Sequence, residues 1–333
     1  MRRRVTTGAG AAALVMLVFA LNFYRLPVVA LTPGPAEDIL SRIKVHGSTP
    51  VYDSKGKLYL TSVGIDDDVR FYEALLDLAN RDVELRRRSE LFPNGDSTDE
   101  IDRENVELMD QSKTVAQVVA LRELGYSIKP SWIEVGDVVR GTPADGKLEA
   151  GDRILQVDGH AVASIDQVRA AITSHRAGER VAFRVSRDMA ATTVAVRVAT
   201  DDGQPRVGVE LRERFKDLPV SVTIETENIG GPSAGLMFAL SIIDRLTLED
   251  LTGGRRIAGT GEISVDREVL PIGGVAEKLV AARRQGATVF LIPRDNCPDV
   301  HGRVPSGLRL VPVATLDDAL RFLRQPETPA PGC

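Results

Sequence analysis

The 333-residue sequence has few cysteines, histidines and aromatic residues, and it has no long basic run. Its two cysteines, Cys297 and Cys333, could form at most one disulfide. With four scattered histidines they cannot supply a cysteine-rich zinc site, so we predict no metal and no cofactor. The net charge of −5 and the short basic runs, such as residues 86–88, do not predict a nucleic-acid partner. A wholly disordered chain is excluded because 43% of the residues are hydrophobic.

One long segment near the amino terminus lacks charge. Three arginines at positions 2–4 precede the uncharged residues 5–24, which as a helix could cross the ~30 Å hydrocarbon core of a bilayer. Basic residues before such a segment favour a cytoplasmic amino terminus. We therefore expect residues 1–30 to be a basic start and a single-pass anchor in the cell membrane, with the remaining chain extracytoplasmic. The alternatives are a cleaved signal peptide, although no clean cleavage site follows, and a buried helix.

Residues 31–129 are expected to form a hairpin and helices. Strand-like stretches at residues 43–51 and 58–63 flank the turn at residues 53–56 and predict a hairpin. Helical spacing over residues 70–90 and 100–124 predicts two helices. The sequence Thr-Pro-Gly-Pro at residues 32–35 is expected to break the helix of the anchor, and residues 326–333 to be a flexible tail.

A loop in the middle of the chain has two interpretations. Residues 141–148 match three of the four fixed positions of the phosphate-binding pattern GxxxxGK[ST]. Leu148 stands where a hydroxyl residue would hold magnesium, and no strand-to-helix context surrounds the loop, so we do not favour nucleotide binding. The longer stretch from Gly141, GTPADGKLEAGDRILQVDGHAV, resembles a PDZ domain.

The surrounding residues 130–202 have a pattern that suits such a β-rich domain. Strands are predicted at residues 153–157, 181–185 and 193–198, and a short amphipathic helix at residues 165–172. The resemblance implies that an extended peptide terminus binds by strand addition. The usual carboxylate-binding loop before the second strand is missing, and a purely structural spacer is the alternative.

The first candidate catalytic residue is Ser233. It follows the alternating strand at residues 220–226 and lies in the sequence Gly-Gly-Pro-Ser-Ala-Gly, just before a strongly apolar helix at residues 236–243. Small neighbours, Gly231, Pro232 and Ala234, allow a substrate backbone to approach, and the amides at a helix start favour an oxyanion. These features suit an acyl-transfer nucleophile, although a serine at a helix start is often only a capping residue.

Two residues could act as the general base for Ser233. The pattern GxSxG also occurs in α/β-hydrolases, where the acid would be Asp295 or Asp299 and the histidine His301, but too little chain follows for that fold. We favour Lys278, because the helical spacing of residues 275–282 places it near an apolar stripe, with Glu277 and Arg284 on the opposite face. Burial lowers the pKa of a lysine, which allows it to act as a base. Only eight of the 42 basic residues are lysines, and arginine cannot act as a base.

Three sequence blocks in this region resemble a known family. The blocks GPSAG at residues 231–235, TGEI at 260–263 and LPIGGVAEKL at 270–279 are similar to the proteolytic domain of the Lon protease family, a Ser-Lys dyad peptidase. The resemblance implies that Ser233 is the nucleophile and Lys278 the general base. It also implies that Thr260 hydrogen-bonds Lys278 and that the amide of Ser233 contributes to an oxyanion hole. Cytoplasmic members often carry Asp where Gly230 stands, so gating by that acid is not expected.

The sequence therefore predicts an α+β multidomain protein with a transmembrane helix, a PDZ-like domain and an α/β Lon-like proteolytic domain at residues 203–325. This order resembles the PDZ-containing Lon-type proteases of bacteria, without an ATPase module. The expected function is ATP-independent, membrane-anchored serine endopeptidase activity on unfolded or flexible extracytoplasmic protein segments. The expected partners are protein or peptide substrates, the membrane and, as the resemblance suggests, further copies of the chain. The alternative is a membrane-tethered adaptor with an idle Lon-like scaffold.

Overall fold

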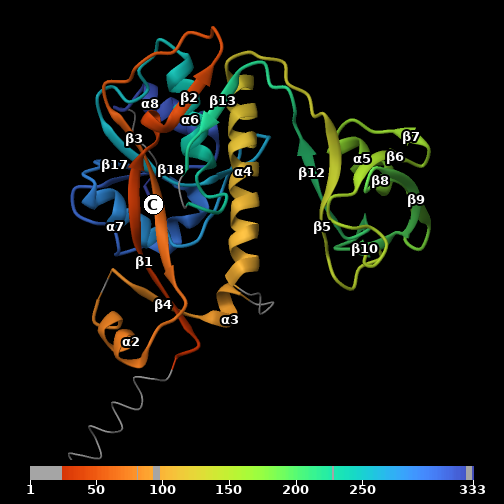
Figure 1. The fold of residues 1–333 in the computed structure, drawn as a ribbon, viewed down its shortest axis with the longest axis horizontal. Coiled ribbons are helices and arrows are strands. Elements are labelled where there is room, and N and C mark those ends of the chain that lie inside the picture. Colours follow the sequence, from red (N-terminus) through yellow and green to blue (C-terminus); the bar gives the residue numbers. More distant parts are fainter. Residues whose placement is uncertain (1–24, 81, 93–97, 227–228, 328–331) are drawn as a thin grey trace, which may run out of the picture. The chain divides into compact units, whose positions relative to one another are not determined.

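The computed structural model describes residues 25–80, 82–92, 98–226, 229–327 and 332–333. The predicted anchor, residues 5–24, lies outside them. Within the described ranges, no helix is both long and apolar enough to cross a membrane. The chain divides into two compact units, of which the first comprises Met1–Gly125 with Val220–Cys333 and the second Tyr126–Pro219 (Figure 1). The second unit is therefore inserted in sequence between two halves of the first.

A mixed six-stranded sheet, in the order β18-β17-β14-β3-β1-β4, forms the centre of the first unit. The neighbours from β18 to β3 are parallel, whereas β1 is antiparallel to both β3 and β4. In addition, β2 pairs with β13 and β15 with β16. The strands are β1 (Val28–Asp38), β2 (Ile43–His46), β3 (Lys57–Asp66), β4 (Glu84–Arg87), β13 (Ser221–Ile224), β14 (Arg256–Gly259), β15 (Glu262–Ile263), β16 (Val269–Leu270), β17 (Val289–Pro293) and β18 (Arg309–Val313).

Helices α6 and α7 cover opposite faces of this sheet. Ala258 of β14 packs with Val275 and Leu279 of α7. The next strand residue, Gly259, faces the other way, because successive side chains of a strand alternate; a Cβ there would lie 2.6 Å from Sδ of Met237 in α6. The helices of this unit are η1 (Ile39–Arg42), α2 (Phe71–Asp77), α3 (Arg88–Leu91), α4 (Thr98–Glu123), α6 (Gly235–Leu246), α7 (Val275–Arg284), η2 (Arg294–Val300) and α8 (Leu316–Arg324).

The inserted unit has its own sheet and core. Its strand order is β12-β5-β6-β8-β9, with β7 beside β6, and β10 pairs separately with β11. Phe183 is fully buried in this core. The elements are β5 (Trp132–Val138), β6 (Arg153–Val157), β7 (His160–Ala161), α5 (Ile165–Thr173), β8 (Arg180–Arg187), β9 (Ala190–Arg197), β10 (Ala199–Asp201), β11 (Gln204–Arg206) and β12 (Val209–Arg214). The predicted strands and helix of this region are therefore confirmed.

The phosphate-loop pattern is explained by packing in this unit. Residues 140–151 form turns rather than a strand-to-helix loop. Leu148, which interrupts the pattern, is buried in the same core as Phe183. The loop therefore contributes a side chain to the core of the inserted unit.

Two expectations for the amino-terminal region were wrong. Residues 43–51 and 58–63 do not form a hairpin, because β2 pairs with β13 and β3 pairs with β1. Residues 70–90 are helical only in α2 and α3, because Glu84–Arg87 instead pair with β1. Residues 32–35 lie within β1, which has a register shift between Pro33 and Ala36, and the anchor helix that they were expected to break lies outside the described residues. A Cβ at Gly34 would lie 2.6 Å from Oγ of Ser62 in β3, so the close approach of β1 to β3 at this point requires glycine.

The compact units also differ from the division expected from the sequence. That division separates residues 31–129 from residues 203–325, whereas the structure joins most of both in one unit. Strand β12, assigned above to the proteolytic region, pairs with β5 of the inserted unit. The expected helix at residues 100–124 is confirmed as α4.

Cys297 and Cys333 form a disulfide with a Cα–Cα distance of 5.0 Å. The bond joins η2 to the end of the segment expected to be a flexible tail. The sequence left this pairing open.

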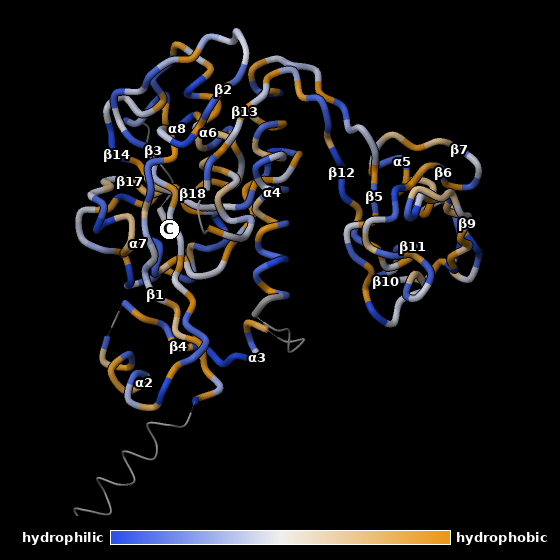
Figure 2. The backbone as a smooth tube through the Cα atoms, viewed as in Figure 1, coloured by the Kyte–Doolittle hydropathy of each residue, from blue (hydrophilic) through white to orange (hydrophobic). Residues whose placement is uncertain are grey.

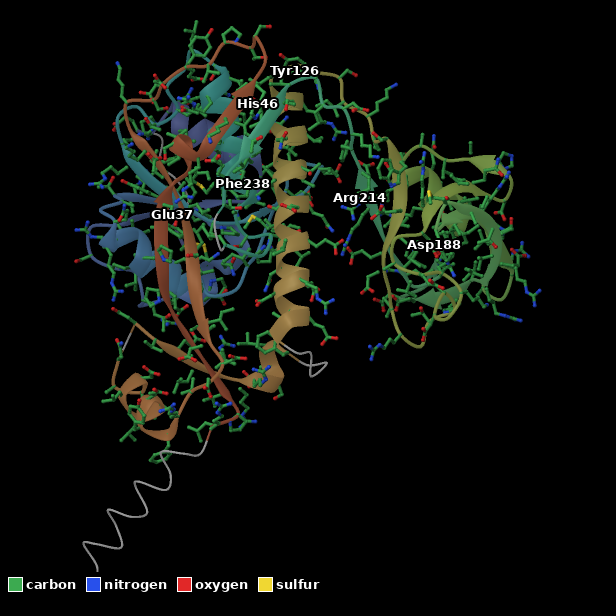
Figure 3. All side chains as sticks on the ribbon, in the orientation of Figure 1. Glu37, His46, Tyr126, Asp188, Arg214 and Phe238 are labelled. Carbon is green, nitrogen blue, oxygen red and sulfur yellow. A yellow bond between two sulfur atoms is a disulfide. The ribbon has the colours of Figure 1, made fainter. Side chains whose placement is uncertain are left out.

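Because each unit has its own core, a cavity in one should leave the other stable. Phe183 in β8 and Phe238 in α6 are both fully buried, and Phe238 is labelled in Figure 3. We expect Phe183→Ala to lower the unfolding free energy of residues 126–219 by about 3–5 kcal/mol, measured by calorimetry of the whole chain. The matched variant Phe238→Ala should affect the other transition. Equal shifts of both transitions in either variant would show that the units unfold together.

Candidate active site

Ser233 lies in the turn that leads into α6, as expected from the sequence. The preceding Gly231 has a φ of +83°, which favours glycine. Its N–H donates a hydrogen bond to the carbonyl oxygen of Asn105 in α4 at 2.9 Å. A Cβ at Gly230 would lie 2.8 Å from Cβ of Asn105. The glycines therefore allow the serine loop to lie directly against α4.

A side chain of α4 fixes the same loop. Oγ of Ser112 donates to the carbonyl oxygen of Pro232 at 3.0 Å. Ser112 is buried. Sequence reasoning missed Asn105 and Ser112, because more than a hundred residues, including the inserted unit, separate them from Ser233. No local pattern could have identified them.

Lys278 approaches Ser233 from α7, on the other face of the sheet. Its Nζ lies 2.7 Å from Oγ of Ser233 and 2.9 Å from Oγ1 of Thr260. Lys278 is only 3% exposed, because Val275 and Leu279 on the same helix pack into the core. This burial disfavours the ammonium form and lowers the pKa of Lys278 to about 7. The sequence correctly predicted this buried lysine.

Thr260 connects the two residues at the carboxyl end of β14. Its hydroxyl donates to the carbonyl oxygen of Ser233 at 3.0 Å, and the N–H of Gly261 donates to the same oxygen at 2.8 Å. Because a hydroxyl has one hydrogen to donate, Thr260 can only accept from Lys278. A neutral Lys278 then directs an N–H at Thr260 and keeps its lone pair for Ser233.

The turn also offers donors for a negatively charged oxygen. Within the described part of the chain, the N–H groups of Ser233 and Ala234 donate no backbone hydrogen bond. Both precede the twelve-residue helix α6, whose N-terminal end carries a partial positive charge. The arrangement can therefore stabilise an oxyanion next to Oγ of Ser233.

One feature of α7 differs from the expectation. Glu277 was expected on the exposed face, but it is buried. Its Oε1 accepts a hydrogen bond from Nη2 of Arg303 at 3.0 Å, and burial raises the pKa of its carboxyl group. The chain near Arg303 covers the helix face that the pattern of α7 alone assigns to solvent. Arg284 is exposed, as expected.

The alternative histidine partner is not assembled. His301 is exposed and has no hydrogen bond to Ser233. Oδ2 of Asp299 accepts from Nδ2 of Asn296 at 2.8 Å. The geometry therefore favours the Ser-Lys pair over a Ser-His-Asp arrangement.

Two family models match this chain. Residues 206–324 match the Lon protease (S16) C-terminal proteolytic domain, and residues 109–198 match the PDZ domain. Both domains are therefore present.

Curated relatives match over a similar length. The Lon protease of Azospirillum brasilense is 41% identical over 109 residues, which is 32% of this chain and 13% of that protein. The Lon protease of Campylobacter concisus is 42% identical over 125 residues, or 36% of this chain and 15% of that protein. The chain thus spans only a small part of the length of these relatives.

Among solved structures, the chain is similar to the PDZ domain of the SdrC-like protein from Listeria innocua. The identity is 23% and the TM-score 0.24, and the match covers 26% of this chain and 98% of that chain.

Replacing the buried lysine should stabilise the protein. Between pH 7 and pH 10 an unfolded lysine binds a proton that folded Lys278 lacks, so the stability of the parent rises with pH in this range. We expect Lys278→Met to raise the unfolding free energy at pH 7 by on the order of 2 kcal/mol and to reduce this pH dependence, measured by denaturant titration. The exposed Lys55→Met is the matched control and should change neither. A destabilised Lys278→Met variant with unchanged pH dependence would contradict a neutral buried lysine.

Proposed function

We propose that this protein is a serine endopeptidase in which Ser233 is the nucleophile and Lys278 the general base. The contact between Nζ of the buried Lys278 and Oγ of Ser233, at 2.7 Å, is the observation that carries the proposal. The matches to the Lon proteolytic domain and to Lon proteases support peptide-bond hydrolysis.

The mechanism follows from the protonation state of the lysine. Neutral Lys278 accepts the proton of Ser233 as Oγ attacks the scissile carbonyl carbon. The amides of Ser233 and Ala234 stabilise the tetrahedral oxyanion. The Lys278 ammonium then protonates the leaving amine, which yields an acyl-enzyme. A water molecule activated by Lys278 hydrolyses this ester and restores Ser233.

The proposed location is the extracytoplasmic side of the membrane. The uncharged residues 5–24 and the preceding arginines support a single-pass anchor. The disulfide between Cys297 and Cys333 supports an oxidising compartment, since such bonds are rare in the cytosol. The substrates proposed are unfolded or flexible segments of proteins in that compartment.

The inserted unit is proposed to bind these substrates or a partner. Its PDZ-type fold suits the binding of extended peptides, which pair as an additional strand with the edge of its sheet. The proposed activity needs no ATP, because an extended segment enters the site without forced unfolding.

The first test is cleavage of casein without ATP by the full-length protein in detergent. We expect the parent to cleave casein and Ser233→Ala and Lys278→Ala each to reduce the rate by at least about 10³-fold. The exposed Lys55→Ala should remain active, and thermal unfolding should show that every variant is folded. Retained activity in Ser233→Ala or Lys278→Ala would disprove the dyad. An inactive but folded parent would instead favour the adaptor function.

The second test is the pH dependence of kcat/KM. A general base must be unprotonated, and the pKa of Lys278 is lowered to about 7. We expect kcat/KM to rise about tenfold per pH unit below pH 7 and to level off above it. Initial rates on a fluorogenic peptide between pH 5.5 and pH 9 would measure this. An inflection near pH 10 would indicate a lysine with an ordinary pKa and contradict the proposed base.

A further inference from the structure

Helix α2 exposes its large apolar residues and buries a small one. Leu75, Leu76 and Leu78, at and just beyond its end, are 62%, 66% and 75% exposed, whereas Ala74 packs against Val69. Figure 2 shows hydrophobic colouring along α2. Surface helices normally have the opposite arrangement, with leucines facing the core. Exposed apolar residues gathered on one element mark an interaction surface more often than scattered ones do.

This surface lies close to where the unit joins residues 5–24. The first described residue, Arg25, forms a β-bridge with Arg70, and its Nε pairs with Oδ1 of Asp68 at 2.8 Å. The N–H of Leu26 donates to the carbonyl oxygen of Val69 at 3.0 Å. Helix α2 begins at the next residue after Arg70 and is only about 10 Å long. Its leucines therefore cannot lie far from Arg25.

We propose that α2 docks on the lipid bilayer by inserting Leu75, Leu76 and Leu78 into the interfacial region. The inference rests on the anchor in the proposed function, since residues 5–24 would enter the hydrocarbon core next to Arg25. The interfacial region extends roughly 5–7 Å beyond that core on each side, and apolar helix faces bind there. The helix itself carries only the acidic Glu73 and Asp77, and Arg25 beside it is paired with Asp68, which limits the attraction for anionic lipids. The contact is therefore apolar and depends little on salt.

The test places a fluorescent tryptophan on this surface. The full-length protein has one natural tryptophan, Trp132. Trp132→Phe removes its signal and keeps an aromatic ring for Arg153 and Lys216, which lie over it. Leu76→Trp is added to this background, and the protein is reconstituted in phosphatidylcholine vesicles with or without bromine on the acyl chains. We expect brominated lipid to reduce the emission of this variant about twofold, equally at low and high salt.

Two further variants make the result interpretable. Leu248→Trp is the matched control, because Leu248 is also an exposed leucine of the same unit, at 84%, and it should not be quenched. Phe19→Trp reports on the anchor itself. Leu75→Trp replaces Leu76→Trp if thermal unfolding shows that the latter variant is misfolded.

The outcomes separate the docking from the anchor. Quenching at position 76 but not at 248 supports docking on lipid. Quenching at position 19 without quenching at 76 leaves the anchor in place and overturns the docking. In that case, emission at 76 that shifts to the blue with increasing protein density would identify a second copy as the occupant. If neither position 19 nor position 76 is quenched, the anchor has failed, and the docking with it.

Discussion

The site depends on one physical constraint, which is the burial of a lysine whose pKa is thereby lowered to about 7. Desolvation alone lowers the pKa of Lys278. An ammonium could not accept a proton from Ser233, so the proposed chemistry requires this burial. Thr260 also orients the amine of Lys278. Its single hydroxyl hydrogen is donated to the carbonyl oxygen of Ser233, so it can only accept a hydrogen bond from Lys278. Any change that hydrates Lys278 would therefore raise its pKa and weaken it as a base.

Local sequence predicted the geometry of the candidate site well and the topology less well. The serine turn, the buried face of α7 and the elements of the inserted unit follow from short-range periodicity and from glycine positions. The amino-terminal strands could not be predicted in this way, because they form through pairing with strands that are distant in sequence. Residues 84–87, for example, have helical spacing but are extended because they pair with β1. The expectation that Glu277 is exposed was wrong for the same reason. Arg303, which is distant in sequence, covers a helix face that periodicity assigns to solvent.

The exposed leucines of α2 show that an apolar residue in a helical pattern need not lie in the protein core. Helical spacing over residues 70–90 predicted a helix, and part of that segment is helical. The core of this region is closed instead by small and β-branched residues, among them Ala30, Val69 and Ala74. Apolar periodicity reports that a face avoids water. It does not distinguish a protein interior from a lipid surface.

The insertion explains why the matched proteolytic segment is not a structural unit by itself. Residues 206–324 lack β1, β3 and β4, which form half of the six-stranded sheet. They also lack α4, whose Ser112 and Asn105 hold the serine loop. The inserted unit follows α4 and precedes β13, so it enters the chain between the helix that supports the nucleophile and the segment that carries it. In the proposed enzyme, the peptide-binding unit is therefore inserted between the two segments that position the nucleophile. The catalytic unit can fold only when the segments before and after the insertion pack together.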